Sequence, residues 1–309
     1  MSPTSHTNTT STPVGTPQSK LPNPTKKSST TTNSSKTDKN SEAIADSNQP
    51  TKKPDRFPSS NTSKTTRPPK PGLSTKIKRI KTKLLSTYYG NPARDMKLIC
   101  IAGTTGKTTV ARFVHDILGS ADQQVAIFSS DEPFKAGVLH KFLSDAWKAG
   151  ATHAVITAPT EVISAQVFHG LPIHLIALTD FSPASSNPAY IDDHLDAYAT
   201  LFQTSPAHII LNRDDAYYPD FSEFTGNATV LTYGVDPSAD LHIDNSKLYK
   251  LGSEANLSLD QEHFTVASFL TGEPIIPQMA AAATIAAALH ISPTTIADGI
   301  ATYDPSENN

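Results

Sequence analysis

This 309-residue chain is organised around one stretch, Ile101-Ala102-Gly103-Thr104-Thr105-Gly106-Lys107-Thr108-Thr109-Val110. An apolar run over residues 97–101 leads into it and predicts a buried strand, and the pattern of residues 110–118 predicts a helix. A strand, a glycine-containing turn, Gly-Lys-Thr and a helix together form the setting of a phosphate-binding loop. The alternative is an ordinary strand-to-helix turn that contains Gly-Lys-Thr by chance.

The residue types of this loop suit a nucleotide polyphosphate. Gly103 and Gly106 let backbone N–H groups close around phosphate oxygens, and the following helix adds its N-terminal amides and dipole. Lys107 supplies a positive charge for the β- and γ-phosphates, and the Thr108 hydroxyl is a ligand for Mg²⁺. We therefore expect ATP and Mg²⁺ as cofactors, with Lys107 catalytic and Thr108 a metal ligand. The loop residues expected to contact the nucleotide are Gly103, Thr104, Thr105, Gly106, Lys107, Thr108 and Thr109.

Composition divides the chain into a tail and a domain. Residues 1–72 are rich in Ser, Thr, Pro, Asn and Lys, and Phe57 is their only aromatic residue. Such a segment cannot bury enough apolar surface to offset chain entropy, so we predict a disordered tail. The remaining sequence predicts one folded domain over residues 93–304 and a short tail over residues 305–309.

Charge divides the chain in nearly the same place. Residues 1–90 carry 13 Lys and 3 Arg against 4 acidic residues, a net charge of +12. The rest carries 10 basic and 25 acidic residues, a net charge of −15. Two interpretations stay open: the basic arm contacts an anionic surface, or it is a solubilising tail that associates with the acidic domain. We expect no specific nucleic-acid partner.

A basic amphipathic helix and linker are predicted over residues 73–92. Leu73, Ile77, Ile80 and Leu84 recur at helical spacing, and the opposite face is rich in lysine. This helix lies either on a membrane surface or on the folded domain with its lysines in water.

Cysteine content and hydropathy predict a cytoplasmic protein. Cys100 is the only cysteine, which implies no disulfide and fits a reducing compartment. The first residues lack the apolar segment of a secretory signal, and no run approaches the roughly 18 apolar residues that a membrane span needs.

From residue 97 onward, predicted strands alternate with predicted helices. This alternation predicts an α/β fold with a mainly parallel sheet flanked by helices, and a small antiparallel β meander over residues 240–270. A helix within residues 137–150 carries Leu139 and Trp147 on one face. Strands are expected at residues 97–101, 124–128, 152–157, 173–179, 207–212 and 228–234, and further helices at residues 161–168, 193–202, 279–289 and 293–302.

The loop has a compact form, Gly-Thr-Thr-Gly-Lys-Thr-Thr at residues 103–109, and it resembles the nucleotide loop of the Mur ligase family. These proteins are ATP-dependent amino-acid ligases of peptidoglycan synthesis, and folylpolyglutamate synthetases are their relatives. Leu-Asn-Arg-Asp-Asp-Ala-Tyr at residues 211–217 is similar to the family's Ile-Asn-Ala-Asp-Asp-Pro-Tyr, and residues 280–289 resemble one of its alanine-rich helices. The resemblance implies that residues 93–304 are the central, ATP-binding domain of such a ligase.

The resemblance also implies roles outside the loop. Asn212 and Asp215 are expected to contact the nucleotide, and Glu161 is expected to bind the metal. Asp193-His194-Leu195-Asp196 is similar to the family's Asp-His-Leu-Asp, which makes His194 a candidate catalytic residue. The structural alternatives are that Asp215 caps a helix and that His194 is solvated at a helix N-terminus.

Three positions depart from the family pattern. The family's magnesium-binding glutamate falls on Thr157, and its carbamylated lysine falls on Tyr198. Its adenine-contacting asparagine falls on Ala280, with Gln278 close by. The family's third domain begins near the end of this sequence, so we expect a partner protein to supply it.

Three hypotheses about function follow. By the resemblance, the chain is an ATP-dependent acid–amino-acid ligase that acts through an acyl phosphate on a cell-wall precursor. The alternative is a catalytically degenerate nucleotide-binding or scaffold protein that works with a partner ligase. An unrelated P-loop NTPase is disfavoured, because no second carboxylate ends the predicted strand at residues 153–157.

Overall fold

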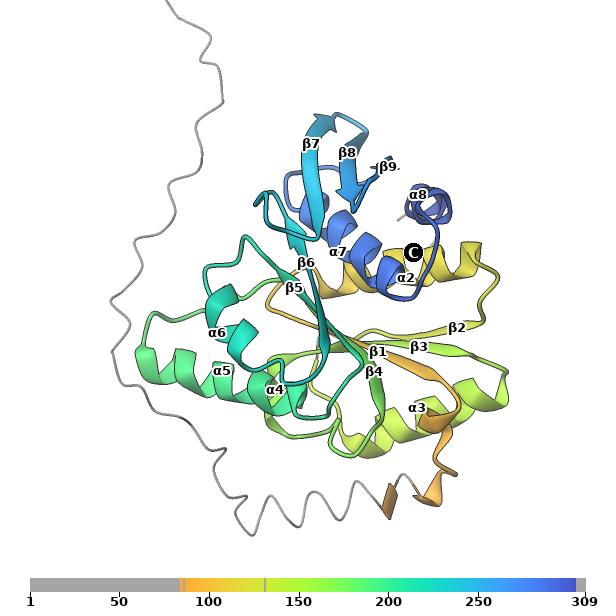
Figure 1. Cartoon of the computed structure of the whole chain (residues 1–309). Coiled ribbons are helices and arrows are strands. Elements are labelled where there is room, and N and C mark those ends of the chain that lie inside the picture. Colours follow the sequence, from red (N-terminus) through yellow and green to blue (C-terminus); the bar gives the residue numbers. More distant parts are fainter. Residues whose placement is uncertain (1–83, 86, 131, 304–309) are drawn as a thin grey trace, which may run out of the picture. The chain divides into compact units, whose positions relative to one another are not determined.

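The structure is a computed structural model, and the part of the chain that it describes is shown in Figure 1. The predicted tails over residues 1–72 and 305–309 lie outside the described residues, and so does most of the predicted helix over residues 73–92. Leu84 and Tyr88, at the end of that segment, are helical. The described residues are 84, 85, 87–130 and 132–303.

A single nine-stranded sheet runs through the described part of the chain, in the order β2-β3-β1-β4-β5-β6-β7-β8-β9. Strands β1 to β7 pair in parallel, and β8 and β9 are antiparallel to their neighbours. The predicted α/β fold with a mainly parallel sheet is confirmed. The strands are β1 (Lys97–Ala102), β2 (Val125–Phe128), β3 (His153–Ala158), β4 (Ile173–Leu178), β5 (His208–Asn212), β6 (Thr229–Gly234), β7 (Leu241–Tyr249), β8 (Gly252–Leu259) and β9 (Glu262–Ser268).

Helices cover both faces of the sheet. Helices α2, α7 and α8 pack on one face, and α3, α4, α5 and α6 pack on the other (Figure 1). None of the described helices is both long and apolar enough to cross a membrane. A short 3-10 turn, η1 (Pro92–Arg94), precedes β1, and the helices are α2 (Lys107–Ser120), α3 (Ala136–Lys148), α4 (Thr160–Ser164), α5 (Pro188–Phe202), α6 (Tyr218–Glu223), α7 (Ile275–Ala288) and α8 (Pro293–Thr302).

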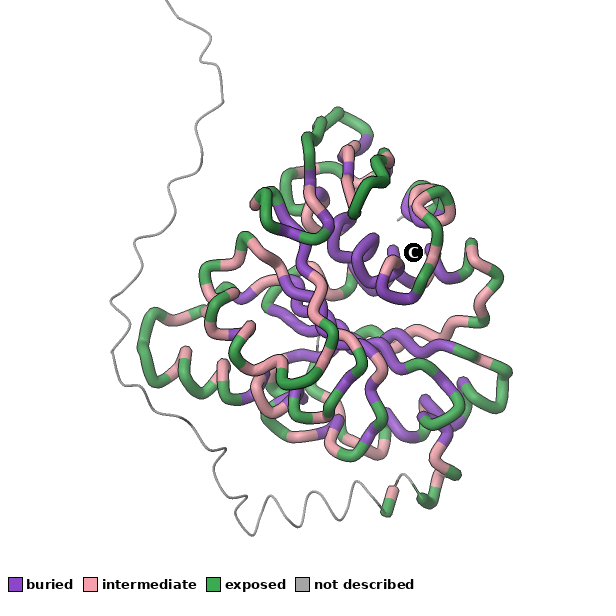
Figure 2. The backbone as a smooth tube through the Cα atoms, viewed as in Figure 1, coloured by how far each residue is buried: buried purple, intermediate pink, exposed green. Residues whose placement is uncertain are grey.

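Strand β1 lies inside the sheet and explains why the sequence before the loop is apolar throughout. Ile99 and Ile101 belong to the hydrophobic cluster on the side of α2 and α7, whereas Leu98 and Cys100 belong to the cluster on the side of α3 and α5. All four side chains are buried. Figure 2 shows that buried residues, in purple, gather along the strands in the middle of the molecule. A parallel strand that is covered on both faces must be apolar at every position.

Several details differ from the sequence prediction. The predicted antiparallel meander is present as β7, β8 and β9, and the parallel pairing of Leu241 of β7 with Tyr233 of β6, which was not predicted, joins it to the main sheet. Trp147 is 42% exposed although Leu139 is buried. Eight residues along a helix add a rotation of about 80° beyond two full turns, which carries Trp147 to the edge of the buried face. The helix predicted over residues 161–168 is shorter, and α6 was not predicted.

Histidines gather at the edge of the sheet where its strands begin. His153 begins β3 and pairs with Lys97 of β1, and the His174 and His208 rings lie 5.6 Å apart between β4 and β5. Burial lowers the pKa of His153 to about 4 and also lowers the pKa of His174 and of His208. The charge of Lys97 contributes to all three pKa shifts.

We expect these histidines to make the fold less stable in mild acid. Their pKa values are lower in the folded chain, so the unfolded chain binds more protons below its own histidine pKa of about 6.5. The stability contributed by the neutral rings is complete above that pH and is lost as the pH falls toward 4. Burial raises the pKa of Asp215 to about 6, which acts in the opposite direction.

Thermal unfolding between about pH 7.5 and pH 5 measures this effect. Removing one ring with His153→Gln should flatten the dependence of the melting temperature on pH. A variant profile as steep as that of the wild type would contradict the assignment.

Candidate functional site

The predicted phosphate-binding loop connects the carboxyl end of β1 to the first turn of α2. In an open parallel sheet, ligands bind at this edge. Because β1 lies between β3 and β4, the segments that follow those two strands flank the loop.

Both glycines of the loop have conformations that other residues disfavour. Gly103 has a φ of +133°, and a Cβ atom there would lie 2.1 Å from Oγ1 of Thr179. Gly106 has a φ of +77°, and a Cβ atom there would lie 2.9 Å from Nε2 of Gln278. Glycine is required at both positions because the loop fits closely between the end of β4 and α7.

The segment after β4 holds the first half of the loop in place. The N–H of Thr104 donates to the carbonyl oxygen of Asp180 at 3.0 Å, and the N–H of Ser182 donates to Oγ1 of Thr104 at 2.9 Å. The Thr179 hydroxyl donates to the carbonyl oxygen of Thr105 at 2.6 Å. Sequence reasoning did not assign these residues to the site, although the strand next to β1 is where such contacts are expected.

A carboxylate also lies against the loop. Oδ1 of Asp180 accepts a hydrogen bond from the N–H of Thr105 at 2.7 Å, and Oδ2 accepts one from the Thr105 hydroxyl at 3.1 Å. One backbone donor of the loop is therefore occupied by an anionic group of the chain itself.

Lys107 has the position expected of a phosphate-binding lysine. Its Nζ donates to the carbonyl oxygens of Gly103 and Thr104, each at 3.0 Å, so the ammonium group lies over the loop. Both acceptors are neutral, so they do not cancel the charge of the ammonium group. The first N–H groups of a helix such as α2 have no acceptor within the helix. A positive charge beside helix N-terminal amides fits a nucleotide polyphosphate.

Thr108 lies in the first turn of α2, and the Ser129 hydroxyl donates to its Oγ1 at 3.3 Å. Mg²⁺ prefers oxygen ligands and keeps several of its waters. The Thr108 hydroxyl, together with phosphate oxygens of a bound nucleotide and water, would fit one such ion. Glu161, the other predicted metal ligand, is exposed in the first turn of α4. Within the described residues, no group of three or more His, Cys, Asp or Glu side chains is arranged to hold a metal.

Asn212 and Asp215 shape the turn after β5. Oδ1 of Asn212 accepts from the N–H of Asp214 at 3.0 Å. Oδ2 of Asp215 accepts from the N–H of Phe181 at 2.6 Å, and Oδ1 accepts from the N–H of Tyr217 at 2.8 Å. Asp215 therefore ties this turn to the segment that supports the loop, and a direct contact with a nucleotide stays a prediction.

His194 lies within α5, where its Nδ1 is 2.8 Å from the carbonyl oxygen of Tyr190 and its ring packs on the Tyr190 ring. The helix begins at Pro188 and is capped by Asn187, which is earlier than predicted. The alternative that His194 is solvated at the helix N-terminus is therefore wrong, and its catalytic role stays a prediction.

Comparison with known proteins agrees with this geometry. The sequence pattern of the Mur ligase middle domain matches residues 101–286, which is more than half of the chain. The chain belongs to the Mur ligase family. A 2,6-diaminopimelate ligase acting on UDP-N-acetylmuramoyl-L-alanyl-D-glutamate, from Halalkalibacterium halodurans, is 23% identical over 237 residues, which are 68% of this chain and 47% of that protein.

Solved structures of the Mur ligase type share the fold. One ligase of that same name has a TM-score of 0.66 at 22% identity and covers 74% of this chain and 50% of its own. Folylpolyglutamate synthase of Mycobacterium tuberculosis, complexed with ADP and AMPPCP, has a TM-score of 0.59 at 14% identity and covers 73% and 63%. This chain spans about half the length of the curated relatives it matches.

Tyr198 differs from the Mur ligase pattern in a way that affects metal binding. The family resemblance places a carbamylated lysine at this position. The Tyr198 hydroxyl lies 3.2 Å from Oγ1 of Thr160 and hydrogen-bonds to the Gly103 backbone. Burial raises the pKa of Tyr198 to about 12, so the phenol is neutral and is not an anionic ligand. The uncharged side chains of Thr157 and Tyr198 do not fit the metal-binding roles that the family resemblance implies for their positions.

Gln278 of α7 contacts the loop at Gly106. The Mur ligase resemblance places an adenine-contacting asparagine two residues later, at Ala280. Ala280 is fully buried and has no polar group to offer, whereas Gln278 packs against Gly106. The Oε1 atom of Gln278 is buried without a hydrogen-bond partner among the described residues. Among the polar side chains of α7, Gln278 is the nearest in sequence to Ala280, the position at which contact with the adenine base is expected.

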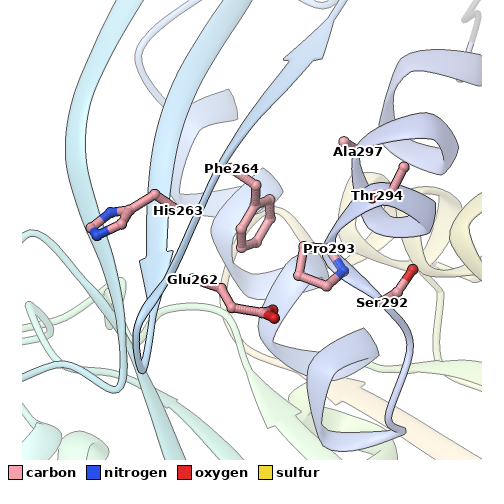
Figure 3. Close-up of a pocket in the computed structure, with 7 residues that line it drawn as sticks. All are labelled: Glu262, His263, Phe264, Ser292, Pro293, Thr294 and Ala297. Atoms are coloured by element: carbon pink, nitrogen blue, oxygen red, sulfur yellow. The ribbon is translucent and has the colours of Figure 1, made fainter.

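A separate open hollow lies between β9 and the start of α8 (Figure 3). The Glu262 carboxylate points toward Pro293, with Phe264 between the two elements, and the His263 ring points away. None of the site residues predicted from sequence lines this hollow, so it does not bear on the phosphate-binding loop.

Proposed function

We propose that this chain binds ATP together with Mg²⁺ through residues 103–109, as the nucleotide-binding part of an acid–amino-acid ligase of peptidoglycan precursor synthesis. The observation that carries the proposal is the position of Lys107 Nζ, over the carbonyl groups of Gly103 and Thr104 at the N-terminus of α2. Membership of the Mur ligase family supports the reaction class.

ATP bound with Mg²⁺ would supply the γ-phosphoryl group that converts a substrate carboxylate into an acyl phosphate, with ADP as the leaving group. An amine would then displace phosphate from the acyl carbon to form the amide bond. This chain's residues bind and orient the polyphosphate: the α2 amides bind its oxygens, and Lys107 offsets the charge on the transferring group. The Thr108 hydroxyl orients the metal. We propose ligation only for a larger assembly. That assembly includes counterparts of the half of each relative that this chain does not match, and they are supplied either by a continuation of this chain or by a partner protein.

A second candidate is a nucleotide-binding scaffold without ligase activity. The neutral, buried Tyr198 and the uncharged Thr157 favour it, because they stand where the family pattern has metal ligands. Release of ADP that depends on a carboxylate substrate, in the presence of candidate partner proteins, would separate the two candidates. A chain that binds ATP but supports no such release would favour the scaffold.

Removing the loop cation with Lys107→Ala should weaken binding of ATP with Mg²⁺ by about 30-fold, because one charge-assisted contact to phosphate is lost. Titration calorimetry on the full chain measures the change. Lys148→Ala, an exposed lysine at the end of α3, is the matched control and should bind as the wild type does. Absence of binding by the wild type would overturn the proposed function.

We also propose that the folded domain spans residues 93–304 and that the protein works in the cytoplasm. The buried free thiol of Cys100 fits a reducing compartment. We further propose that the basic tail contacts an anionic surface and that the substrate of the ligation is a cell-wall precursor.

A further inference from the structure

The contact between Asp180 and the loop places a negative charge where a phosphate-binding site needs positive ones. Its Oδ1 takes the backbone N–H of Thr105 at 2.7 Å, and its Oδ2 takes the hydroxyl of the same residue at 3.1 Å. The Thr179 hydroxyl also lies 3.3 Å from Oδ1, but its single proton is best placed for the carbonyl oxygen of Thr105 at 2.6 Å. These donors are neutral, so they fix the carboxylate without cancelling its charge.

Within the described part of the chain, Asp180 makes no ion pair with Lys, Arg or His. Lys107 directs its Nζ to the carbonyl oxygens of Gly103 and Thr104. Further carboxylates stand nearby, because Asp215 binds the N–H of Phe181, the residue next to Asp180.

The charge of Asp180 acts on its surroundings. It contributes to the raised pKa values of Tyr198, Asp215 and Tyr233, which come from α5, the β5 turn and β6. A polyphosphate that enters the loop meets the electric field of the Asp180 carboxylate. Because this carboxylate lies against Thr105, it is only a few ångströms from the loop and repels the negative charge of the polyphosphate.

We propose that Asp180 is a specificity-determining residue that makes the loop accept a nucleoside triphosphate only when a divalent cation is bound to the polyphosphate. The proposal rests on the proposed function of the loop. The cation lowers the charge of the ligand and removes most of the repulsion, whereas the metal-free nucleotide brings its full charge beside the carboxylate. The selectivity therefore arises from the anion of the chain as well as from the metal ligand Thr108.

An isosteric substitution separates the charge of Asp180 from its structural contacts. In Asp180→Asn the amide oxygen still accepts from the N–H of Thr105, and the Thr105 hydroxyl can accept from the new NH₂ group. Asp180→Ser removes the same charge and keeps one acceptor. Asp298→Asn, at an exposed position on α8, removes one negative charge far from the loop and is the matched control.

The experiment is titration calorimetry of the full chain with ATP, once with Mg²⁺ and once with EDTA, at fixed ionic strength. For the wild type and Asp298→Asn, we expect metal-free ATP to bind at least about 30-fold more weakly than ATP with Mg²⁺. For Asp180→Asn and Asp180→Ser, the ratio should fall to about threefold, through tighter binding of metal-free ATP.

Two results would overturn the proposal. One is a variant that keeps the wild-type ratio, which would leave Asp180 as a purely structural tie. The other is a wild type whose affinities for ATP with Mg²⁺ and for metal-free ATP differ by less than about threefold, a result that does not depend on the folding of any variant. A wild type that binds neither form of ATP contradicts the proposed function itself, so the two failures are distinguishable.

Discussion

Replacing Gly103 by alanine is expected to abolish nucleotide binding. The new Cβ atom would lie 2.1 Å from Oγ1 of Thr179, inside the closest distance that such atoms reach. Thr179 cannot turn aside freely, because its hydroxyl donates to the carbonyl oxygen of Thr105 at 2.6 Å and lies 3.2 Å from the carbonyl oxygen of Ala102. The φ of +133° at Gly103 adds backbone strain of about 1–3 kcal/mol for any other residue.

We expect this substitution to weaken ATP binding by at least about 100-fold and to lower the melting temperature by several degrees. Calorimetry and thermal unfolding measure the two effects. Gly119→Ala is the matched control, because Gly119 lies near the end of α2 with open space where its Cβ would be. That control should be neutral or slightly stabilising, since alanine favours helix. Wild-type affinity in Gly103→Ala would show that the loop is not the nucleotide site.

Replacing Gly299 by alanine is expected to destabilise the fold more than any other change considered. Gly299 lies in α8 at its contact with α2, and a Cβ atom there would lie 2.3 Å from the Cα atom of Ile117. The obstructing atom belongs to helix backbone, so the two helices must separate. Overpacking of this kind costs at least about 3 kcal/mol of unfolding free energy.

Urea unfolding of the full chain measures the loss for Gly299→Ala. Asp298→Ala, the adjacent exposed position of α8, is the matched control and should change the unfolding free energy by less than about 0.5 kcal/mol. Equal midpoints for the two variants would mean that α8 does not pack on α2 at this distance. Because α2 begins at the loop, a folded Gly299→Ala protein should also bind ATP more weakly than its control.

Much of the fold could be predicted from local patterns. The run 98–101 predicts a strand buried on both faces because each of its residues is apolar, and the loop is predicted to bind phosphate because Gly, Lys and Thr occur at fixed spacing. The predicted strands and most helices follow from period and composition. The boundaries of α5 were missed because Asn187-Pro188 starts the helix before its apolar pattern begins.

The surroundings of the loop were not predictable in the same way. Asp180 lies 75 residues from Thr105 in sequence, and only the parallel pairing of β1 with β4 brings the two together. The neutral state of Tyr198 depends on complete burial, which no local pattern determines. The extension of the sheet by the meander depends on pairing between β6 and β7, which involves few residues.

The sequence by itself determined that a Gly-Thr-Thr-Gly-Lys-Thr-Thr loop joins a buried strand of a parallel sheet to a helix, because the loop and the strand before it are contiguous residues. The tertiary structure decided which groups surround that loop. It placed the Asp180 carboxylate on a loop amide and the buried Tyr198 phenol beside the Thr160 hydroxyl. The physical reason is that charge and desolvation at a site depend on distances through space, and these are set by how distant strands pair and pack.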